Sequence, residues 1–202
     1  MKRYSLISPS KNKYFLVRHT ECISNIKKIS SYGWEKEDVL TETGIEQAKK
    51  LGNKLKDYKI DLVFCSPFTR TRQTFEIINK KLKIDYKKIF FDKRLIENNF
   101  GIADEKHYDE YHKLFVSEEA YFETPVPLGE NYADVKKRAN NFLSEVESKY
   151  RNKKILIISH GFTLRMIELV AMNLSIKECI EHLRDSHFVQ REEIRPLKFP
   201  KK

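Results

Sequence analysis

The sequence predicts an α/β protein, a three-layer α/β/α sandwich with a mostly parallel central sheet. Three short apolar runs have the length of strands that are buried on both faces: 14–17, 62–65 and 155–158. Each run is followed along the chain by a helical pattern, and alternating strands and helices are typical of a parallel sheet covered by helices. We therefore expect the functional site beyond the carboxyl ends of these strands.

The first strand and the first helix are predicted on either side of a polar segment. The run 14–17 is too short for a helix and is followed directly by an Arg-His pair at 18–19. A helix is predicted over 41–55, with Thr41 or Thr43 as its N-cap. Four apolar residues share one face of it: Ile45, Ala48, Leu51 and Leu55. Charged residues at the end of a buried strand suggest a site there.

Two more strand-to-helix units follow. The run 62–65 leads into a Ser-Pro pair, and proline is favoured at the start of a helix but not inside a strand. The run 155–158 leads into a polar turn and a helical pattern over 163–174. A helix predicted at 132–150 delivers the chain to this last strand. Its apolar face comprises Val135, Ala139, Phe142 and Val146.

The chain is predicted to form a single domain over residues 1–202, with a core at about 13–190. Residues 94–127 are less regular, with weak helix signals at 108–115, and are predicted to be an inserted, lid-like segment over the sheet. The tail, 195–202, contains two prolines and ends in lysines, so we expect it to be loosely attached.

Composition and charge indicate a cytoplasmic protein with a heavily solvated surface. The formal net charge is +10, but basic residues are scattered as pairs among acidic ones, so no nucleic-acid partner is expected. The three cysteines form no CxxC pair, which predicts neither disulfides nor a zinc site. The first residues lack the apolar core of a signal peptide, and no apolar run is long enough to span a bilayer. Nothing in the sequence specifies an oligomeric state.

Four polar segments in a fixed order carry the functional signal. An Arg-His pair at a strand end is ambiguous by itself, because both residues often make structural hydrogen bonds. The segments are Arg-His-Thr-Glu at 18–21 followed by Asn25, Ser-Pro-Phe-Thr-Arg at 66–70, Leu-Ile-Glu-Asn-Asn-Phe-Gly at 95–101, and Ser-His-Gly-Phe-Thr-Leu-Arg at 159–165. With these motifs in this order, the chain resembles the histidine phosphatase superfamily, with its phosphoglycerate mutase-like fold, from residue 14 to about 190.

The resemblance implies a nucleophile and a phosphate clamp. His19 is implied as the nucleophile, because a neutral imidazole has a lone pair that can attack phosphorus near neutral pH. Arg18 and Arg70 present planar guanidinium groups that match phosphoryl oxygens. His160 would add a third donor to the charge that spreads over those oxygens in the transition state.

The resemblance also implies an acid/base group and further substrate contacts. Glu97 would give a proton to the leaving group and later take one from water. The alternative for Glu97 is an exposed loop glutamate paired with Arg94 or Lys93, but agreement with the motif favours the acid/base role. Asn25 and Gly161 complete the implied substrate-binding set. The implied reaction needs no metal and no other cofactor, and its partner is a small phosphorylated substrate.

Within the superfamily, the sequence favours a small phosphatase branch, that is, a phosphoric monoester hydrolase acting on a small phosphorylated metabolite. The chain is shorter than typical cofactor-dependent mutases and lacks their long insertion after the acid/base glutamate. Phosphoglycerate mutase-type transfer to a second hydroxyl stays open as an alternative. A catalytically silent module that binds a phosphoester or a protein is a further alternative, although the five implied catalytic residues are all present.

Overall fold

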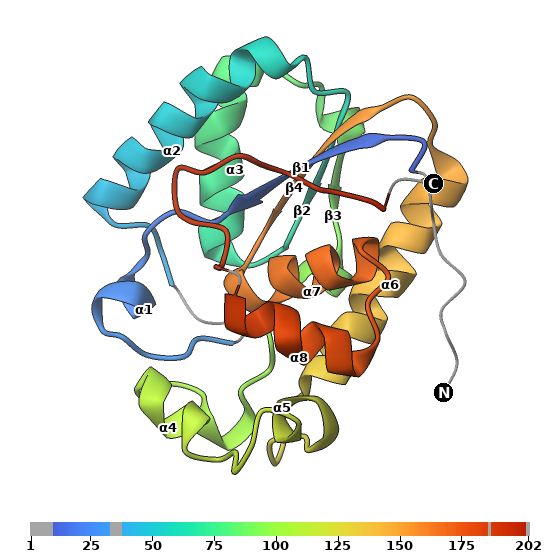
Figure 1. Cartoon of the computed structure of the whole chain (residues 1–202). Helices are drawn as coiled ribbons and strands as arrows, with labels where there is room; N and C mark the ends of the chain where they lie inside the picture. Colours follow the sequence, from blue (N-terminus) through green and yellow to red (C-terminus); the bar gives the residue numbers. More distant parts are fainter. Residues whose placement is uncertain (1–9, 33–37, 186, 201–202) are drawn as a thin grey trace.

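The central sheet of the computed structural model has five strands in the order β3-β2-β4-β1-β5 (Figure 1). The structure describes residues 10–32, 38–185 and 187–200, and the expectations for residues 1–9 and 201–202 lie outside this part. The strands within it are β1 Lys13–Arg18, β2 Leu62–Cys65, β3 Ile89–Phe91, β4 Lys154–Ser159 and β5 Arg195–Pro196. Strands β1 to β4 pair in parallel and β5 pairs antiparallel with β1, which confirms the predicted sheet.

Helices cover both faces of this sheet, as predicted for a sandwich. Helices α2 and α3 pack together on one face, and α6 and α7 pack together on the other (Figure 1). The described α-helices are α1 Ile23–Ile26, α2 Glu42–Leu55, α3 Thr69–Leu82, α4 Tyr108–His112, α5 Ala120–Glu123, α6 Tyr132–Lys149, α7 Gly161–Ala171 and α8 Ile176–Asp185. Short 3-10 helices lie between them: η1 Lys56–Tyr58, η2 Tyr86–Lys88, η3 Lys93–Leu95 and η4 Gly101–Ala103.

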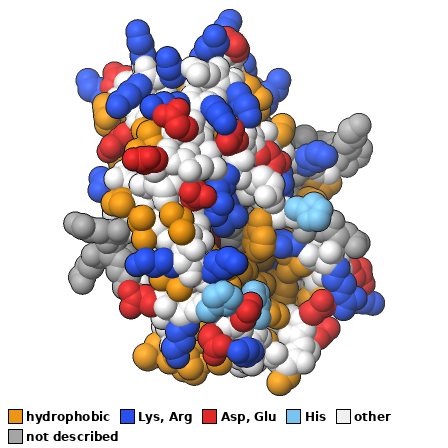
Figure 2. Space-filling view, turned by 90° about the vertical axis from the view of Figure 1, so that its left-hand side faces the viewer, with side chains coloured by type: hydrophobic (Ala, Val, Ile, Leu, Met, Phe, Trp, Pro, Cys, Tyr) orange, Lys and Arg blue, Asp and Glu red, His pale blue; other side chains and the backbone are white. Residues whose placement is uncertain are grey.

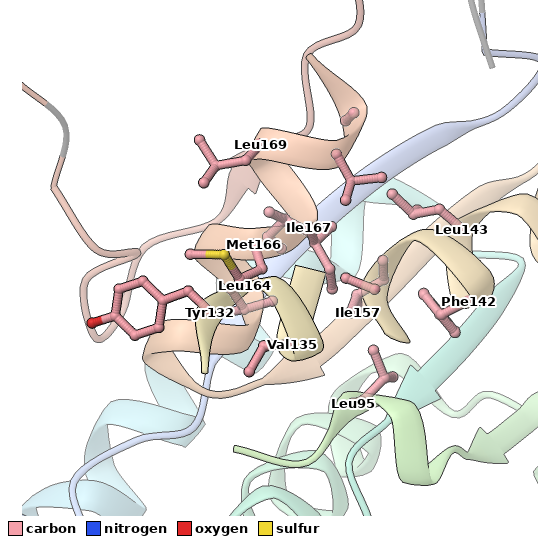
Figure 3. Packing of buried hydrophobic residues seen from close by; sticks show 14 of the residues in the cluster. Leu95, Tyr132, Val135, Phe142, Leu143, Ile157, Leu164, Met166, Ile167 and Leu169 are labelled. Atoms are coloured by element: carbon pink, nitrogen blue, oxygen red, sulfur yellow. The ribbon is translucent and has the colours of Figure 1, made fainter. Parts of the chain in front are cut away.

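Side chains of the three central strands alternate between the two faces of the sheet. The residues that pack with α2 and α3 are Val17, Val63, Cys65, Leu156 and Ile158. The residues that pack with α6 and α7 are Leu16, Leu62, Phe64, Ile155 and Ile157. Figure 3 shows Ile157 beside Phe142 of α6 and close to Leu164 and Ile167 of α7. Burial on both faces explains why these strands are continuous apolar runs in the sequence.

Helix α2 has the predicted position, and three of the four residues predicted for its buried face are buried: Ala48, Leu51 and Leu55. Thr41 is its N-cap, and the Thr41 hydroxyl accepts a hydrogen bond from the Gly44 N–H at 3.0 Å. The sequence places Ile45 on the buried face, yet Ile45 is 36% exposed. The helix instead contacts the loop after β1 through Gly44, where a Cβ atom would lie 2.0 Å from the carbonyl oxygen of Glu21. Because Gly44 faces inwards, Ile45 lies about 100° around the helix and points outwards.

The other elements agree with the sequence in position but less well at their ends. Helix α6 begins at the predicted residue 132. Helix α7 begins at Gly161 rather than at residue 163, because His160 is its N-cap, and it ends at Ala171. The sequence predicts neither β3 nor α8. Strand β3 has only three residues and lies at the edge of the sheet, so its apolar pattern is too short to identify.

The irregular segment 94–127 packs beyond the carboxyl ends of the parallel strands, where Figure 1 shows α4 and α5. Contacts between aromatic rings attach this segment to α7. The Phe100 ring meets the Tyr111 ring edge to face at 5.1 Å and the Phe162 ring of α7 at 5.8 Å. Phe100 and Tyr111 are both buried. The segment is therefore fixed on α7 by ring packing, and its movement as a lid stays a prediction.

The expectation of a loose tail is wrong for residues 195–197. Strand β5 pairs with β1, and the Leu197 N–H donates to the carbonyl oxygen of Tyr14 at 3.0 Å. Leu197 is only 8% exposed, and the guanidinium group of Arg195 contacts the carboxylate of Glu168 at 3.3 Å. The prediction took the prolines as a sign of irregular structure. Pro196, however, lies in an edge strand, where a residue without an N–H is tolerated.

We expect Leu197→Ala to lower the free energy of unfolding by about 2 kcal/mol, because it removes a buried side chain from the end of the main core. Urea denaturation of the variant and of the wild type measures this difference. Val116→Ala is the matched control, because Val116 is fully exposed and its truncation should change stability by less than about 0.5 kcal/mol. Equal stability of Leu197→Ala and wild type would show that the tail is loose in solution.

Candidate active site

The candidate site lies where β1, β2 and β4 end at the same edge of the sheet. Arg18 is in register with Ser159, and Cys65 is in register with Ile158, so the residues that follow these strands meet there. A pocket of about 240 Å³ opens at this edge. Figure 2 shows a hollow with hydrophobic side chains inside it and Lys or Arg and His side chains around it. Six of the predicted site residues line the pocket: Arg18, His19, Asn25, Arg70, Glu97 and Gly161.

His19 is held with one ring nitrogen free for chemistry. Its backbone N–H donates to the Ser159 carbonyl oxygen at 2.9 Å, which continues the pairing of β1 with β4. The side-chain Nδ1 atom lies 2.8 Å from the carbonyl oxygen of Thr20. Because a carbonyl oxygen can only accept, Nδ1 carries the proton and the lone pair of the neutral ring is on Nε2.

Burial keeps the His19 ring neutral. The side chain is almost completely buried, and burial lowers its pKa well below the usual 6.5. The positive charges of Arg70 and Arg18 lower this pKa further. At neutral pH the imidazole is therefore unprotonated on Nε2, which is the state that a nucleophile requires.

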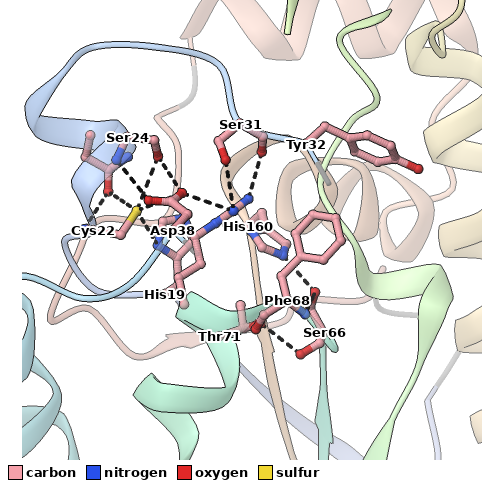
Figure 4. Close-up of polar contacts among 12 residues, drawn as sticks. His19, Cys22, Ser24, Ser31, Tyr32, Asp38, Ser66, Phe68, Thr71 and His160 are labelled. Carbon is pink, nitrogen blue, oxygen red and sulfur yellow. Dashed lines mark hydrogen bonds and ion pairs between the residues drawn. The ribbon is translucent and has the colours of Figure 1, made fainter. Parts of the chain in front are cut away.

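Arg70 is buried, and most of its donors are already used by the protein. Its Nη1 atom lies 3.2 Å from a carboxylate oxygen of Asp38, and the side chains of both residues are about 95% buried. Its Nη2 atom donates to the Ser31 carbonyl oxygen at 3.1 Å, and its Nε atom donates to Nδ1 of His160 at 3.2 Å. Figure 4 shows Asp38, Ser31 and His160 at the centre of this network. Arg70 thus lines the pocket with its charge balanced by Asp38.

His160 differs in position from the sequence-based expectation. It is completely buried, and it is not among the described residues that line the pocket. Since its Nδ1 accepts from Arg70, the ring proton is on Nε2, which donates to the Ser66 hydroxyl oxygen at 2.7 Å. Burial and the charge of Arg70 lower the pKa of His160 well below its usual value. The structure gives His160 a positioning contact to Arg70, and its direct contact with a phosphoryl group stays a prediction.

Glu97 is fixed at the N-terminus of α7. Its carboxylate accepts backbone hydrogen bonds from Asn98 at 2.9 Å, from Thr163 at 3.3 Å and from Phe162 at 3.4 Å. Helix N-termini favour negative groups in this position. Glu97 is 7% exposed, so it is not the exposed loop glutamate that the sequence allowed as an alternative.

Arg94, which the sequence offered as a possible partner of Glu97, contacts other carboxylates. The Arg94 guanidinium group contacts Asp92 at 2.6 Å and Glu145 at 2.7 Å. These two carboxylates occupy the fork of Arg94 and hold it on the outer surface of α6. The structure therefore leaves the Glu97 carboxylate facing the pocket beside Arg18 and His19.

Arg18, Gly161 and Asn25 complete the predicted set. Burial lowers the pKa of the Arg18 guanidinium, and its Nε atom is buried without a hydrogen-bond partner among the described residues. A Cβ atom on Gly161 would lie 3.5 Å from Arg18 Cζ, so this position contacts the guanidinium closely. The Asn25 amide oxygen accepts from the Cys22 N–H at 3.1 Å, and its amide nitrogen donates to the Tyr108 hydroxyl at 3.3 Å.

Sequence reasoning did not find Asp38 or Arg191. Asp38 accepts hydrogen bonds from the Ser24 N–H at 2.9 Å and the Ser24 hydroxyl at 2.6 Å, besides its ion pair with Arg70. Burial, as the main cause, raises the pKa of the adjacent Cys22 thiol to about 11, so this thiol is protonated. Arg191 lines the pocket from the segment after α8. Neither Asp38 nor Arg191 belongs to a recognisable motif.

The outer part of the pocket is lined by rings. Aromatic residues that the sequence did not assign to the site are Phe100, Tyr108, Tyr111, His112, Phe162 and Phe188. They come from the 94–127 segment, from α7 and from the segment after α8. The pocket thus has a polar end at His19 and an aromatic end beyond it.

Two kinds of feature are absent from the described residues. In the part of the chain that the structure describes, no helix combines the length and the apolar character needed to cross a membrane. Across the same residues, no three His, Cys, Asp or Glu side chains are grouped so that they could hold a metal ion.

Comparison with known proteins identifies the family. The family model of the histidine phosphatase superfamily (branch 1) matches residues 14–189. The chain therefore belongs to the histidine phosphatase superfamily, as the motif order predicts. It is 30% identical over 169 residues to a probable phosphoglycerate mutase of Erwinia tasmaniensis, covering 79% of this chain and 74% of that protein. It is 29% identical over 174 residues to a 2,3-bisphosphoglycerate-dependent phosphoglycerate mutase of Rhizobium rhizogenes, covering 82% of each.

Solved structures share the fold. The alpha-ribazole phosphatase from Shigella flexneri has a TM-score of 0.73 and 23% identity, covering 91% of this chain and 89% of its own. Bacillus stearothermophilus YhfR has a TM-score of 0.77 and 23% identity, covering 92% of this chain and 90% of its own. These neighbours confirm the phosphoglycerate mutase-like architecture predicted from the sequence.

We expect stability to decrease in acid because of the two buried neutral histidines. Unfolded histidines have a pKa near 6.5, whereas burial lowers the native pKa of His19 and His160 well below that value. Below about pH 6.5 the unfolded chain therefore binds more protons than the native protein. The free energy of unfolding should fall with decreasing pH by up to about 1.4 kcal/mol per pH unit for each histidine.

His19→Gln should make this pH dependence less steep, which urea denaturation between about pH 7 and about pH 5 can measure. His107→Gln is the control, because His107 is about half exposed and lies outside the pocket lining. If wild type and His19→Gln lose stability equally over this range, His19 is not kept neutral by the fold.

Proposed function

We propose that the protein is a metal-independent phosphomonoester hydrolase that acts on a small phosphorylated metabolite through a phosphohistidine at His19. The observation that carries the proposal is the state of His19: buried, neutral and fixed by the Thr20 carbonyl oxygen so that Nε2 is free. It lines one pocket together with Arg18 and Glu97. A cytoplasmic location, expected from the sequence, is part of this proposal.

In the first step, the Nε2 lone pair of His19 attacks phosphorus and the bond between phosphorus and the leaving oxygen breaks. Glu97, in its protonated form, gives its proton to that oxygen, so the product leaves as an alcohol. The guanidinium groups of Arg18 and Arg70, which both line the pocket, stabilise the negative charge on the phosphoryl oxygens. The result is a phosphoramidate on His19 and an ionised Glu97.

In the second step, water attacks the phosphorus of the phosphohistidine. The Glu97 carboxylate takes a proton from this water, the bond between phosphorus and nitrogen breaks, and the electron pair returns to His19 Nε2. Inorganic phosphate leaves, and the histidine and the protonated glutamic acid are restored. One carboxyl group at a fixed position thus serves both steps, which agrees with the three backbone N–H groups that hold Glu97.

A phosphoglycerate mutase is the second candidate, and the names of the two curated relatives favour it. A mutase must hold a bisphosphorylated intermediate, which needs cations for two phosphoryl groups. The described lining contains three arginines and no lysine, and Arg70 is already balanced by Asp38. The outer part of the pocket is aromatic instead. This distribution of charge favours a substrate with one phosphoryl group and transfer to water.

We expect the purified protein to release phosphate from an aryl phosphate at a rate that a chelator leaves unchanged. The same preparation is assayed for phosphoglycerate mutase activity with 2,3-bisphosphoglycerate. Phosphate release that disappears with the chelator would contradict metal independence. Mutase turnover faster than hydrolysis would favour the second candidate, and inactivity on a broad panel of metabolite phosphates would favour a silent binding module.

We expect His19→Ala to abolish acid-labile phosphate labelling of the protein by a labelled phosphomonoester, because the attacking nitrogen is gone. Rapid quenching in base followed by measurement of protein-bound label tests this. His107→Ala is the control and should be labelled like wild type, because His107 lies outside the pocket lining. Undiminished labelling of His19→Ala would exclude His19 as the nucleophile.

We expect Glu97→Gln to slow the hydrolysis of alkyl phosphates by about 10²- to 10⁴-fold, because the leaving alkoxide then lacks a proton donor. Aryl phosphates with an acidic phenol need little protonation, so the first step with them should be much less affected. Burst kinetics with both substrate types separates the first step from the second. Equal slowing of the first step for both leaving groups would mean that Glu97 is not its proton donor.

A further inference from the structure

Arg191 reaches the candidate active site from the far end of the chain. It lies between α8 and β5 and lines the same pocket as Arg18 and His19. The turn that carries it is well fixed. The Gln190 N–H donates to the Glu193 carboxylate at 2.7 Å, and the Arg195 guanidinium donates to the Phe188 carbonyl oxygen at 3.2 Å. Arg191 is therefore presented by a hydrogen-bonded turn next to the attached strand β5.

Two guanidinium groups, those of Arg18 and Arg191, line the same pocket. The Nε atoms of Arg18 and Arg191 are both buried, and neither has a hydrogen-bond partner among the described residues. Burial is the main cause of the lowered pKa of Arg18; the nearby Glu97 carboxylate raises this pKa, and the positive charge of Arg191 lowers it. Placing two like charges in one half-buried pocket is unfavourable unless an anion binds between them.

The charges of the pocket match one phosphoryl dianion. Asp38 balances Arg70, and His19 is neutral. When Glu97 is protonated, as the first step requires, the remaining formal charges are those of Arg18 and Arg191. These two positive charges equal the charge of a phosphomonoester dianion. No cation is then left over for a second acidic group on the substrate.

We propose that Arg191 and Arg18 together bind the oxygens of the transferred phosphoryl group, so that Arg191 supplies the second free guanidinium of the phosphate clamp. This inference rests on the proposed function for the identity of the anion. It extends the predicted clamp: Arg70 lines the pocket while its side chain contacts Asp38 and His160, whereas the buried Nε atoms of Arg18 and Arg191 have no hydrogen-bond partner among the described residues. The aromatic residues of the pocket then contact the leaving group.

The alternative is that Arg191 binds a second acidic group on the leaving part of the substrate instead of the phosphoryl group. The rings around the outer pocket argue against it. Phe100, Phe162 and Phe188 offer no hydrogen-bond donor, and the other ring residues, Tyr108, Tyr111 and His112, offer polar groups but no fixed positive charge. An anion there would have to be desolvated against rings. The experiment therefore compares phosphate itself with substrates that do and do not carry a second acid.

The test uses Arg191→Gln and Arg191→Lys in the full chain, with Arg184→Gln as the matched control. Arg184 is exposed, pairs with Glu118 and lies outside this pocket lining. Binding of inorganic orthophosphate is measured by calorimetry, and kcat/KM is measured for a neutral aryl phosphate and for a phosphorylated hydroxy acid. We expect Arg191→Gln to weaken orthophosphate binding and to lower kcat/KM for both substrates by about 10- to 100-fold.

Arg191→Lys should recover part of the loss, because it keeps the charge but not the planar fork, and Arg184→Gln should stay within about twofold of wild type. Orthophosphate affinity that is unchanged in Arg191→Gln, or a loss confined to the phosphorylated hydroxy acid, would overturn the inference. Orthophosphate binding needs no turnover, so it is measured independently of enzymatic activity. If the protein has no activity but binds orthophosphate with an affinity that depends on Arg191, the proposed function fails and the inference is supported. Thermal unfolding of each variant shows whether the fold is intact.

Discussion

The buried ion pair between Arg70 and Asp38 is the interaction on which the rest of the site depends. Arg70 comes from the start of α3, and Asp38 accepts hydrogen bonds from Ser24 in α1, so the pair joins two elements that lie far apart in the sequence. Through its Nε atom, Arg70 also sets the proton position on His160. A buried charge whose partner is removed costs about 3–5 kcal/mol, so neither residue can be lost without disturbing the floor of the pocket.

Much of the fold could be predicted from the sequence, because its central strands have an unambiguous physical pattern. The cores of β1, β2 and β4 are continuous apolar runs because both of their faces are covered, and these runs are too short to be helices. β5 escaped prediction because two residues carry no periodicity and one of them is proline. The inward face of α2 was misjudged at Ile45 because a glycine contact with Glu21, which has no signature in one sequence, fixes the rotation of the helix.

The candidate site could be predicted only where it is encoded in contiguous motifs. His19, Arg18 and Glu97 stand at strand ends or in a motif of fixed order, and the structure places all three in one pocket. Asp38 and Arg191 stand in segments without periodicity, so their participation depends on tertiary packing alone. His160 shows that recognising a motif does not give the contacts of its side chain. Its motif is easily recognised, but which atoms its ring nitrogens contact is decided by Arg70 and Ser66, and a sequence does not specify distances.

The order of the strands has a consequence for how the chain folds while it is being synthesised. Strand β1 is made before both of its neighbours, β4 and β5, and the 135 residues 19–153 separate it from β4. At ordinary rates of translation, the apolar residues of β1 wait on the order of 10 s before β4 leaves the ribosome. Such non-local pairing slows folding and leaves an unpaired strand open to wrong contacts. Pairing of β1 within the sheet therefore has to wait until β4 has been synthesised.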